Sequence, residues 1–227
     1  MNGATVYSGP SMLDGSRIHA VLTGTKRPSS NTKTGHMAQL WILPDMHPAT
    51  AVKTGADASV CGTCPRRPSL AAASGLTPCY VTTVHAPLAV WRAHTKAPYP
   101  DVAIRHPYPV RLGAWGDPAA LPLDALQRAI ATGNGGWTGY THVWRSRPDL
   151  RPYLMASCDT QADHDEAVAA GWRTFLIRSS ADVPLPTGTI ACPASAEAGQ
   201  RTTCAQCRLC NGATPGDRRK SIVIIAH

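Results

Sequence analysis

The sequence predicts an α/β fold, a partial parallel βα barrel of about six strands that ends in a cysteine-rich loop. Two observations predict it. From residue 109 onward, short apolar runs alternate with helical patterns, which is typical of parallel βα units. Seven of the eight cysteines gather in two compact sets. A chain of 227 residues is too short for eight βα units plus both cysteine loops, so a partial barrel fits its length better.

The first part of the chain is expected to hold two strands. Apolar runs predict strands over residues 18–22 and 37–43, and Pro44 ends the second. Residues 23–36 are rich in turn-forming residues and predict a loop. We therefore expect residues 1–36 to form a strand and loop that pack on the barrel. A long irregular stretch is expected after the second strand.

The rest of the chain supplies most of the expected barrel. Strands are expected over residues 110–114, 139–144, 153–157, 173–177 and 221–226. Helices are expected over residues 121–131 and 162–170, the second with Asp159 or Thr160 as its N-cap and Gly171 as its end. These elements divide the chain into a barrel over residues 37–190, which carries the first cysteine set, and a final region over residues 191–227, which holds a cysteine-rich loop and a last strand.

Composition favours a cytoplasmic protein with anionic partners. The formal charge is +8 and the pI is near 9.3, which favours nucleic acid, nucleotide or phosphate as a partner. No apolar run approaches a membrane span, and Met1–Thr5 shows no secretory signal, so no membrane association is expected. Cytosolic thiols stay reduced, so eight cysteines favour metal binding. The alternative is four disulfides in a secreted protein.

The first cysteine set is a CxxC pair, Cys61 and Cys64, followed by Cys79 after fourteen intervening residues. Three thiolates can hold a four-iron cluster and leave one iron open to a ligand. Tyr80 follows directly and is expected to pack beside a cofactor, while two arginines just after the CxxC pair offset the charge of the thiolates. The alternative is a zinc knuckle completed by His85 or another histidine.

The second cysteine set is denser. Cys192 precedes Cys204, Cys207 and Cys210, which follow one another at three-residue steps. This spacing indicates a metal-binding loop, and the overlapping CxxC steps resemble a ferredoxin run. Zinc ribbons usually separate their two CxxC pairs, so four thiolates in this arrangement favour a second [4Fe-4S] cluster. Zinc remains the alternative at this C-terminal site.

A glycine-rich motif follows the expected strand over residues 110–114. Gly116 lets the backbone approach a ligand closely, and Asp117 can accept hydrogen bonds from an ammonium group. The segment Trp115-Gly116-Asp117-Pro118 resembles the Gly-Gly-Glu-Pro motif of radical S-adenosylmethionine (radical SAM) enzymes, which contacts the methionyl amine. Asp117 stands in place of the family's glutamate. The first cysteine set likewise resembles the family's site-differentiated cluster, with gaps of two and fourteen residues in place of three and two.

The resemblance covers roughly residues 37–180 and implies further binding residues. It implies that Ser157 and Asp159 contact the nucleoside of S-adenosylmethionine and that Arg178 meets its carboxylate. The C-terminal cysteines are similar to the auxiliary-cluster extensions of many members, and the whole pattern resembles small phage-borne radical-SAM-like proteins. The family's fold is TIM-barrel-like.

The resemblance implies an enzyme that cleaves S-adenosylmethionine to a 5′-deoxyadenosyl radical, with Cys61, Cys64 and Cys79 as the catalytic ligands. That radical would take a hydrogen atom from a substrate, and an electron donor would be needed. The positive charge favours a nucleotide or nucleic-acid base over a peptide as the substrate. Two alternatives remain: a zinc-stabilised nucleic-acid-binding protein without redox chemistry, and an iron–sulfur protein that never opens an iron site.

Two further side chains are expected to be structural. His142 lies between aromatic neighbours in Gly139–Trp144 and is expected to be hydrogen-bonded in a core; the alternative is that it faces the barrel mouth. Cys158 stands apart from both sets and is expected to be a buried structural cysteine; the alternative is a thiol that quenches a radical.

Overall fold

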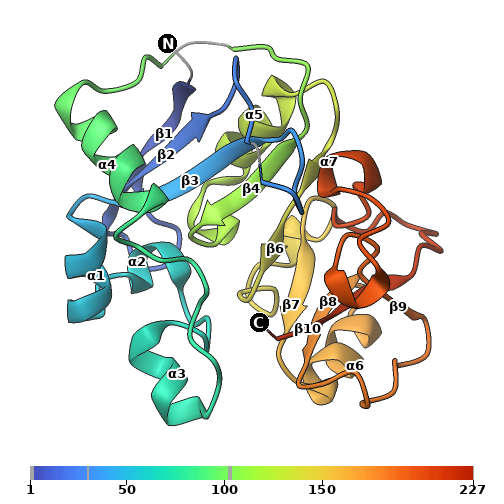
Figure 1. The fold of residues 1–227 in the computed structure, drawn as a ribbon. Coiled ribbons are helices and arrows are strands. Elements are labelled where there is room, and N and C mark those ends of the chain that lie inside the picture. The colour runs from blue at the N-terminus through green and yellow to red at the C-terminus, as the bar shows by residue number, and fades with distance from the viewer. Residues whose placement is uncertain (1–2, 30, 102–103, 227) are drawn as a thin grey trace.

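The computed structural model describes residues 3–29, 31–101 and 104–226 of the 227-residue chain. Residues 1–2, 30, 102–103 and 227, which include parts of the expected N-terminal and C-terminal regions, lie outside this description. The described chain folds into two five-stranded sheets with short helices around them (Figure 1). The expected α/β class is confirmed, with one mixed and one parallel sheet.

The first sheet is mixed. Its strands, in spatial order, are β1 (Gly3–Pro10), β2 (Arg17–Thr23), β3 (Ala38–Pro44), β4 (Val110–Trp115) and β5 (Trp137–Thr138). β1 and β2 run antiparallel, as do β2 and β3, whereas β4 and β5 continue parallel to β3. Strand β1 was not expected from the sequence.

The second sheet is parallel throughout. Its strands are β6 (Tyr140–Thr141), β7 (Met155–Cys158), β8 (Thr174–Arg178), β9 (Thr189–Ala191) and β10 (Ser221–Ile225). The spatial order is β6-β7-β8-β10-β9, so the last strand lies between β8 and β9. Its first four residues are buried, as its continuous apolar run predicts.

A single glycine joins the two sheets. Gly139 alone separates β5, which pairs with β4, from β6, which pairs with β7. A Cβ on Gly139 would lie 2.7 Å from Leu154 Cδ2 and 2.9 Å from Leu112 Cβ, so the junction has no room for a side chain. From β3 to β8, neighbouring strands are therefore parallel and follow chain order. Their carboxyl ends lie toward one edge, where ligands bind in parallel α/β folds.

The segment between β3 and β4, expected to be irregular, instead carries four short helices. They are α1 (Pro48–Thr54), α2 (Ala58–Cys61), α3 (Pro68–Ser74) and α4 (Ala86–Lys96). Proline lies in the first turn of α1, α3 and α4, and left-handed glycines end α1 and α3. Three of these helices span seven residues or fewer and present too few turns for an apolar period to be visible in the sequence, whereas α4, with eleven residues, was missed although it is longer than α5.

The expected helices of the second half are present. The remaining α-helices are α5 (Leu123–Thr132), α6 (Gln161–Ala169) and α7 (Cys204–Cys207), and 3₁₀ turns cover Pro118–Ala120, Pro148–Leu150 and Ala196–Ala198. Thr160 caps α6, because its hydroxyl accepts the Asp163 amide. This assignment leaves Asp159 available for other partners.

Two apolar cores meet at strand β7. The larger core holds fully buried side chains such as Leu40, Leu112 and Leu126. The smaller core, under the C-terminal segment, contains Cys192 and Cys210 together with Met155 of β7 and apolar residues of β10. Over the described residues, no helix has the length and apolar character that crossing a bilayer requires.

Arg173 fastens the C-terminal segment to the second sheet. Its side chain is almost fully buried and donates to the carbonyls of Leu209 (2.6 Å), Asn211 (3.0 Å) and Lys220 (2.9 Å). One guanidinium therefore satisfies three carbonyls on both sides of the loop that precedes β10.

Replacing Arg173 with methionine is expected to lower the free energy of unfolding by about 3 kcal/mol, because buried carbonyls lose a charged donor. Urea unfolding gives the stability, and hydrogen exchange is expected to rise first in residues 204–220. Arg128→Met is the control, since this exposed side chain pairs only with Asp124 one helical turn away, and should change stability by less than about 0.5 kcal/mol. Equal losses in the two variants would contradict the role given to Arg173.

Candidate functional site

A buried ion pair shapes the loop of the first CxxC pair. Arg67 Nη2 donates to Asp57 Oδ1 at 2.6 Å and to the Gly55 carbonyl at 2.7 Å, and Nη1 donates to the Gly62 carbonyl at 3.0 Å. Both carboxylate and guanidinium are buried. Gly62 has a φ of 56°, which lets the chain turn directly after α2 between Cys61 and Cys64.

Cys61, Cys64 and Cys79, the N-terminal cysteine set, lie close enough for their charges to interact. The Cys79 amide donates to the Arg66 carbonyl at 2.8 Å, which brings it back to the CxxC loop. Burial raises the pKa of Cys61 well above its usual value, and the charges of Cys64, Asp57 and Cys79 raise it further. Clustered thiols resist ionisation because their thiolates repel one another, and a bound metal centre relieves that repulsion.

Asp159 joins this set to the ends of the next strands. Its Oδ1 accepts from Arg66 Nε at 2.6 Å, and its Oδ2 lies 3.1 Å from His142 Nε2. The same His142 nitrogen lies 3.8 Å from Cys64 Sγ. The side chain of Asp159 is only 5 % exposed, so this charge is compensated almost entirely by protein groups.

The charges of this network stabilise one another. Burial raises the pKa of Asp159, but the hydrogen bond and charge of His142 and the charge of Arg66 outweigh it, so the pKa lies below its usual range. Burial lowers the pKa of His142, but its interactions with Asp159 and Cys64 outweigh burial and raise the pKa to about 10. His142 is therefore an imidazolium at neutral pH, adjacent to a cysteine of the N-terminal set.

Asp117 ties the ends of β4 and β6 to helix α2. Its Oδ1 accepts the Ala119 amide at 2.9 Å, its Oδ2 accepts the His142 amide at 2.8 Å, and its own amide donates to the Val60 carbonyl at 2.6 Å. Burial raises its pKa, which these hydrogen bonds and His142 oppose. Gly116 has a φ of 85°, and a Cβ there would lie 2.8 Å from the Ile42 carbonyl oxygen. The glycine thus packs directly on β3.

The other three expected binding residues differ in their surroundings. Ser157 is buried on β7 and precedes the strand's last residue. Arg178 ends β8 and donates to the carbonyls of Ala181 and Val183, so these hydrogen bonds close the loop that follows its own strand. Tyr80 is 72 % exposed, and its hydroxyl accepts from an arginine of β4. The described contacts do not join Ser157 or Arg178 to the network around Asp159.

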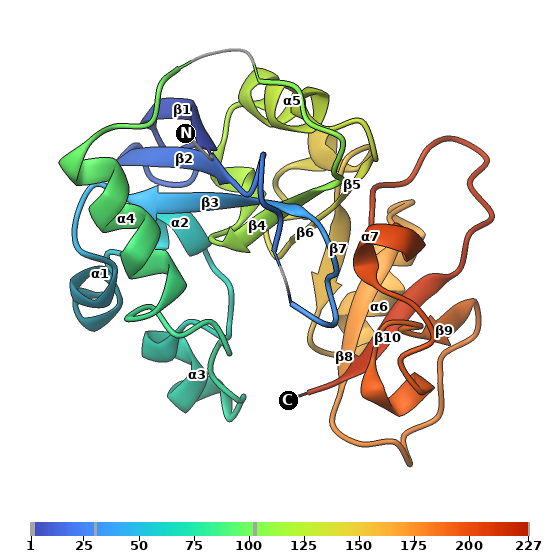
Figure 2. The same cartoon turned by 45° about the horizontal axis from the view of Figure 1, so that its top comes forward.

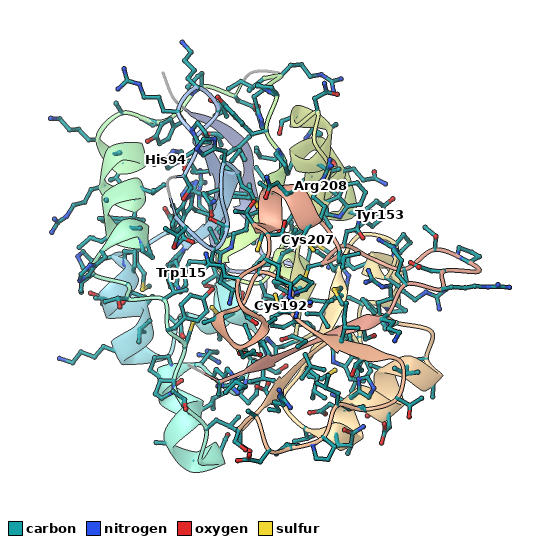
Figure 3. All side chains as sticks on the ribbon, turned by 45° about the vertical axis from the view of Figure 1, so that its right-hand side comes forward. His94, Trp115, Tyr153, Cys192, Cys207 and Arg208 are labelled. Atoms are coloured by element: carbon teal, nitrogen blue, oxygen red, sulfur yellow. The ribbon has the colours of Figure 1, made fainter. Side chains whose placement is uncertain are left out.

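Cys192, Cys204, Cys207 and Cys210, the C-terminal cysteine set, also gather. Figure 3 shows Cys192 and Cys207 on neighbouring parts of the C-terminal segment. The Cys210 carbonyl accepts the amide of Gly139, at the junction of the sheets, at 2.8 Å. Figure 2 shows the loop between β2 and β3 running beside α7, and there the Cys204 amide donates to the Lys33 carbonyl at 3.0 Å.

Thiol pKa values indicate the same clustering. Burial raises the pKa of Cys210 to about 12, and the charges of the other three cysteines add to it, while a hydrogen bond with Tyr140 opposes it. Burial and the charge of Cys192 raise the pKa of Cys204, and the charges of Arg111 and Lys33 oppose the rise. This set therefore combines four thiols with compensating cations.

All eight cysteines are free thiols. Among the described residues, no three His, Cys, Asp or Glu side chains converge closely enough to hold a single metal ion. Cys158 is fully buried in the larger core, in keeping with the structural role expected from the sequence.

Sequence reasoning missed the importance of His142. Its expected burial and hydrogen bonding are present, but its partners are Asp159 and Cys64 rather than core groups. Its position was the available signal, because β6 ends at Thr141 and His142 is the first residue beyond a parallel strand. The expected strand over residues 139–144 was too long to show this.

Comparisons with known proteins return nothing similar: no family model matches the chain, and neither does any curated protein or solved structure.

The pairing of His142 predicts a pH dependence of stability. Its folded pKa, about 10, lies above the unfolded value of about 6.5. Its contribution is therefore complete below about pH 6.5 and is lost as the pH rises toward 10. Urea unfolding of metal-free protein should show the advantage of wild type over His142→Gln shrinking by about 1.4 kcal/mol per pH unit between about pH 7 and 9.

Glutamine retains a donor for Asp159 but cannot carry the proton, so the comparison reports on the imidazole together with its charge interactions with Asp159 and Cys64. Parallel pH profiles of the two proteins would contradict the charge assigned to His142.

Proposed function

We propose that the chain is a radical SAM-type iron–sulfur enzyme that cleaves S-adenosylmethionine to a 5′-deoxyadenosyl radical. One observation carries the proposal: Cys64 of the three-cysteine set lies 3.8 Å from His142 Nε2, in a network that also holds Asp117 and Asp159. These groups come from the connections after four successive parallel strands, β3, β4, β6 and β7. Three thiols leave one iron of a four-iron cluster without a protein ligand.

The strand order supports the finer proposal of a partial βα barrel. Strands β3, β4, β5 with β6, β7 and β8 are successive parallel neighbours, and β10 adds a sixth. The cysteine loop follows the first of these strands, and the Gly116-Asp117 motif follows the second. This order matches the order of motifs that the resemblance implies.

The donor chemistry fits iron–sulfur clusters at both cysteine sets. Thiolate is a soft ligand of the kind that iron–sulfur clusters use. In each set, burial raises the pKa values of the thiols, and the charges of neighbouring cysteines raise them further. Arg66, Arg111 and Lys33 lie near enough to lower the pKa of one or more thiols. Such cations offset the negative charge that four or three thiolates bring to a metal centre.

When bound, an iron–sulfur cluster with an open iron supplies the electron that breaks the sulfonium bond. The chain's own residues do the positioning. Gly116 and Asp117 are proposed to meet the methionyl amine, while Asp117 also fixes the backbone of His142. Ser157 and Asp159 are proposed to contact the nucleoside, and Arg178 the carboxylate.

The substrate proposed for the radical is a nucleotide or nucleic-acid base, supported by the formal charge of +8. The same charge, together with metal-type cysteines, supports the alternative of a zinc-stabilised nucleic-acid-binding protein. Metal content separates the two.

Protein purified without oxygen is expected to be brown and to contain about eight irons and eight inorganic sulfides per chain, as two four-iron clusters require. Colourless protein with stoichiometric zinc at both sets would favour the nucleic-acid-binding alternative. Protein with zinc at the C-terminal set and about four irons at the N-terminal set would still support the proposed catalytic site. Only the assignment of the second metal centre would change.

Reductive cleavage of S-adenosylmethionine tests the open site. Cys61→Ala is expected to abolish production of 5′-deoxyadenosine and to retain the iron of the C-terminal set. Cys158→Ala is the control, because this thiol lies outside both sets and its loss should leave the iron content unchanged. Unchanged production of 5′-deoxyadenosine in Cys61→Ala would overturn the assignment of the open site.

A further inference from the structure

A serine, a histidine and an aspartate meet on the first sheet, outside both cysteine sets. Ser8 of β1 and His19 of β2 are register partners, and 2.8 Å separates the serine Oγ from the histidine Nδ1. On the other side of the ring, His19 Nε2 lies 3.0 Å from Oδ1 of Asp45, which directly follows β3. Strands β1, β2 and β3 lie side by side (Figure 1), so three neighbouring strands bring these groups together.

The two contacts of His19 assign its tautomer when the ring is neutral. A carboxylate only accepts hydrogen bonds, so Nε2 carries the proton and donates it to Asp45. Nδ1 then holds a lone pair and accepts the Ser8 hydroxyl. Arg17 Nε lies 3.7 Å from Oδ2 of Asp45, the carboxylate oxygen that His19 does not use. The connectivity is that of a serine–histidine–aspartate triad, with the imidazole oriented as a base toward the hydroxyl.

The imidazole is packed, whereas the serine is open to solvent. The side chain of His19 is 14 % exposed, and its ring lies 5.0 Å from the ring of His94 on α4, measured between centroids. Burial lowers the pKa of His94, and the charge of His19 lowers it further, so the neighbouring ring is uncharged at neutral pH. Ser8 itself is exposed. A carbonyl can therefore reach the hydroxyl from solvent while the base stays in place.

We propose that Ser8, His19 and Asp45 form a second site, which takes the acyl group from a small activated ester. Ser8 Oγ bonds to the carbonyl carbon while His19 Nδ1 takes the hydroxyl proton. The ester C–O bond then breaks, and the leaving alcohol receives that proton. Water hydrolyses the acyl-serine through the same imidazole, and Asp45 is a positioning residue that stabilises the imidazolium in both steps.

The position of Ser8 in the sheet defines the substrate class. β1 is the outer strand, so alternate backbone amides along it point away from β2 and can bind a developing oxyanion. An exposed serine contacts little of its substrate, so the leaving group must be a good one, such as a phenol. This favours activated esters over amides. The inference is independent of the proposed function, because none of the three residues belongs to the network around Asp159.

The test is reaction with a fluorophosphonate, followed by peptide mapping with mass spectrometry. A bond forms between Ser8 Oγ and phosphorus, and fluoride leaves, so the label stays on the nucleophile. Wild type is expected to be labelled at Ser8. His19→Gln should slow this labelling about a hundredfold, the lower end of what a general base contributes. Ser74 is the internal control, because this exposed hydroxyl donates to the Leu70 carbonyl, and it should stay unlabelled.

Asp45→Asn tests the positioning role separately. The asparagine amide can donate to His19 Nε2, which moves the ring proton to Nδ1 and removes the lone pair that faces Ser8. Labelling of Ser8 should slow, and ¹⁵N NMR of the ring nitrogens should show the exchanged tautomer. An unchanged tautomer would overturn the role given to Asp45.

The acyl step has its own measurement. Wild type treated with p-nitrophenyl acetate should carry an acetyl group on Ser8, found by the same mapping, and His19→Gln should not. Absence of both labels from Ser8, or labelling that His19→Gln leaves unchanged, would overturn the proposal. Cys61→Ala should label at Ser8 at the wild-type rate, so either result leaves the proposed radical chemistry to be judged by its own tests.

Discussion

The buried carboxylate of Asp159 holds the candidate site together. It binds Arg66, from the first cysteine loop, and His142, from the end of β6, while standing itself at the end of β7. Removing one partner of a buried pair leaves an uncompensated charge, which typically costs about 3–5 kcal/mol. The three segments therefore stay in register through one side chain, and Asp117, which follows β4, adds a second tie to His142 by accepting its amide.

The junction at Gly139 explains why both cysteine sets belong to a single arrangement. The glycine joins the sheets, and its amide binds the carbonyl of Cys210. The C-terminal set is thus anchored where β5 becomes β6. The N-terminal set lies in the segment after β3, two strands away in the same sheet.

Much of this fold is predictable from the sequence because its strands are short apolar runs that end at proline, glycine or charge. The four helices between β3 and β4 escaped prediction: three of them span seven residues or fewer, and α4 was missed although its eleven residues exceed the length of α5. Within the site, the cysteines and Asp159 could be identified from spacing and from position after a strand. The contact between His142 and Cys64 could not be identified from the sequence, because the two residues are 78 positions apart and meet only through the order of the strands.

The central claim is that the N-terminal cysteine set leaves one iron open to S-adenosylmethionine. The most direct measurement is the electron paramagnetic resonance spectrum of the reduced Cys204→Ala/Cys207→Ala protein, recorded before and after S-adenosylmethionine is added. The account predicts a four-iron signal whose g-values change on addition, because the ligand reaches the cluster itself. A signal that S-adenosylmethionine leaves unaltered, or a protein that carries only zinc at this set, would contradict it.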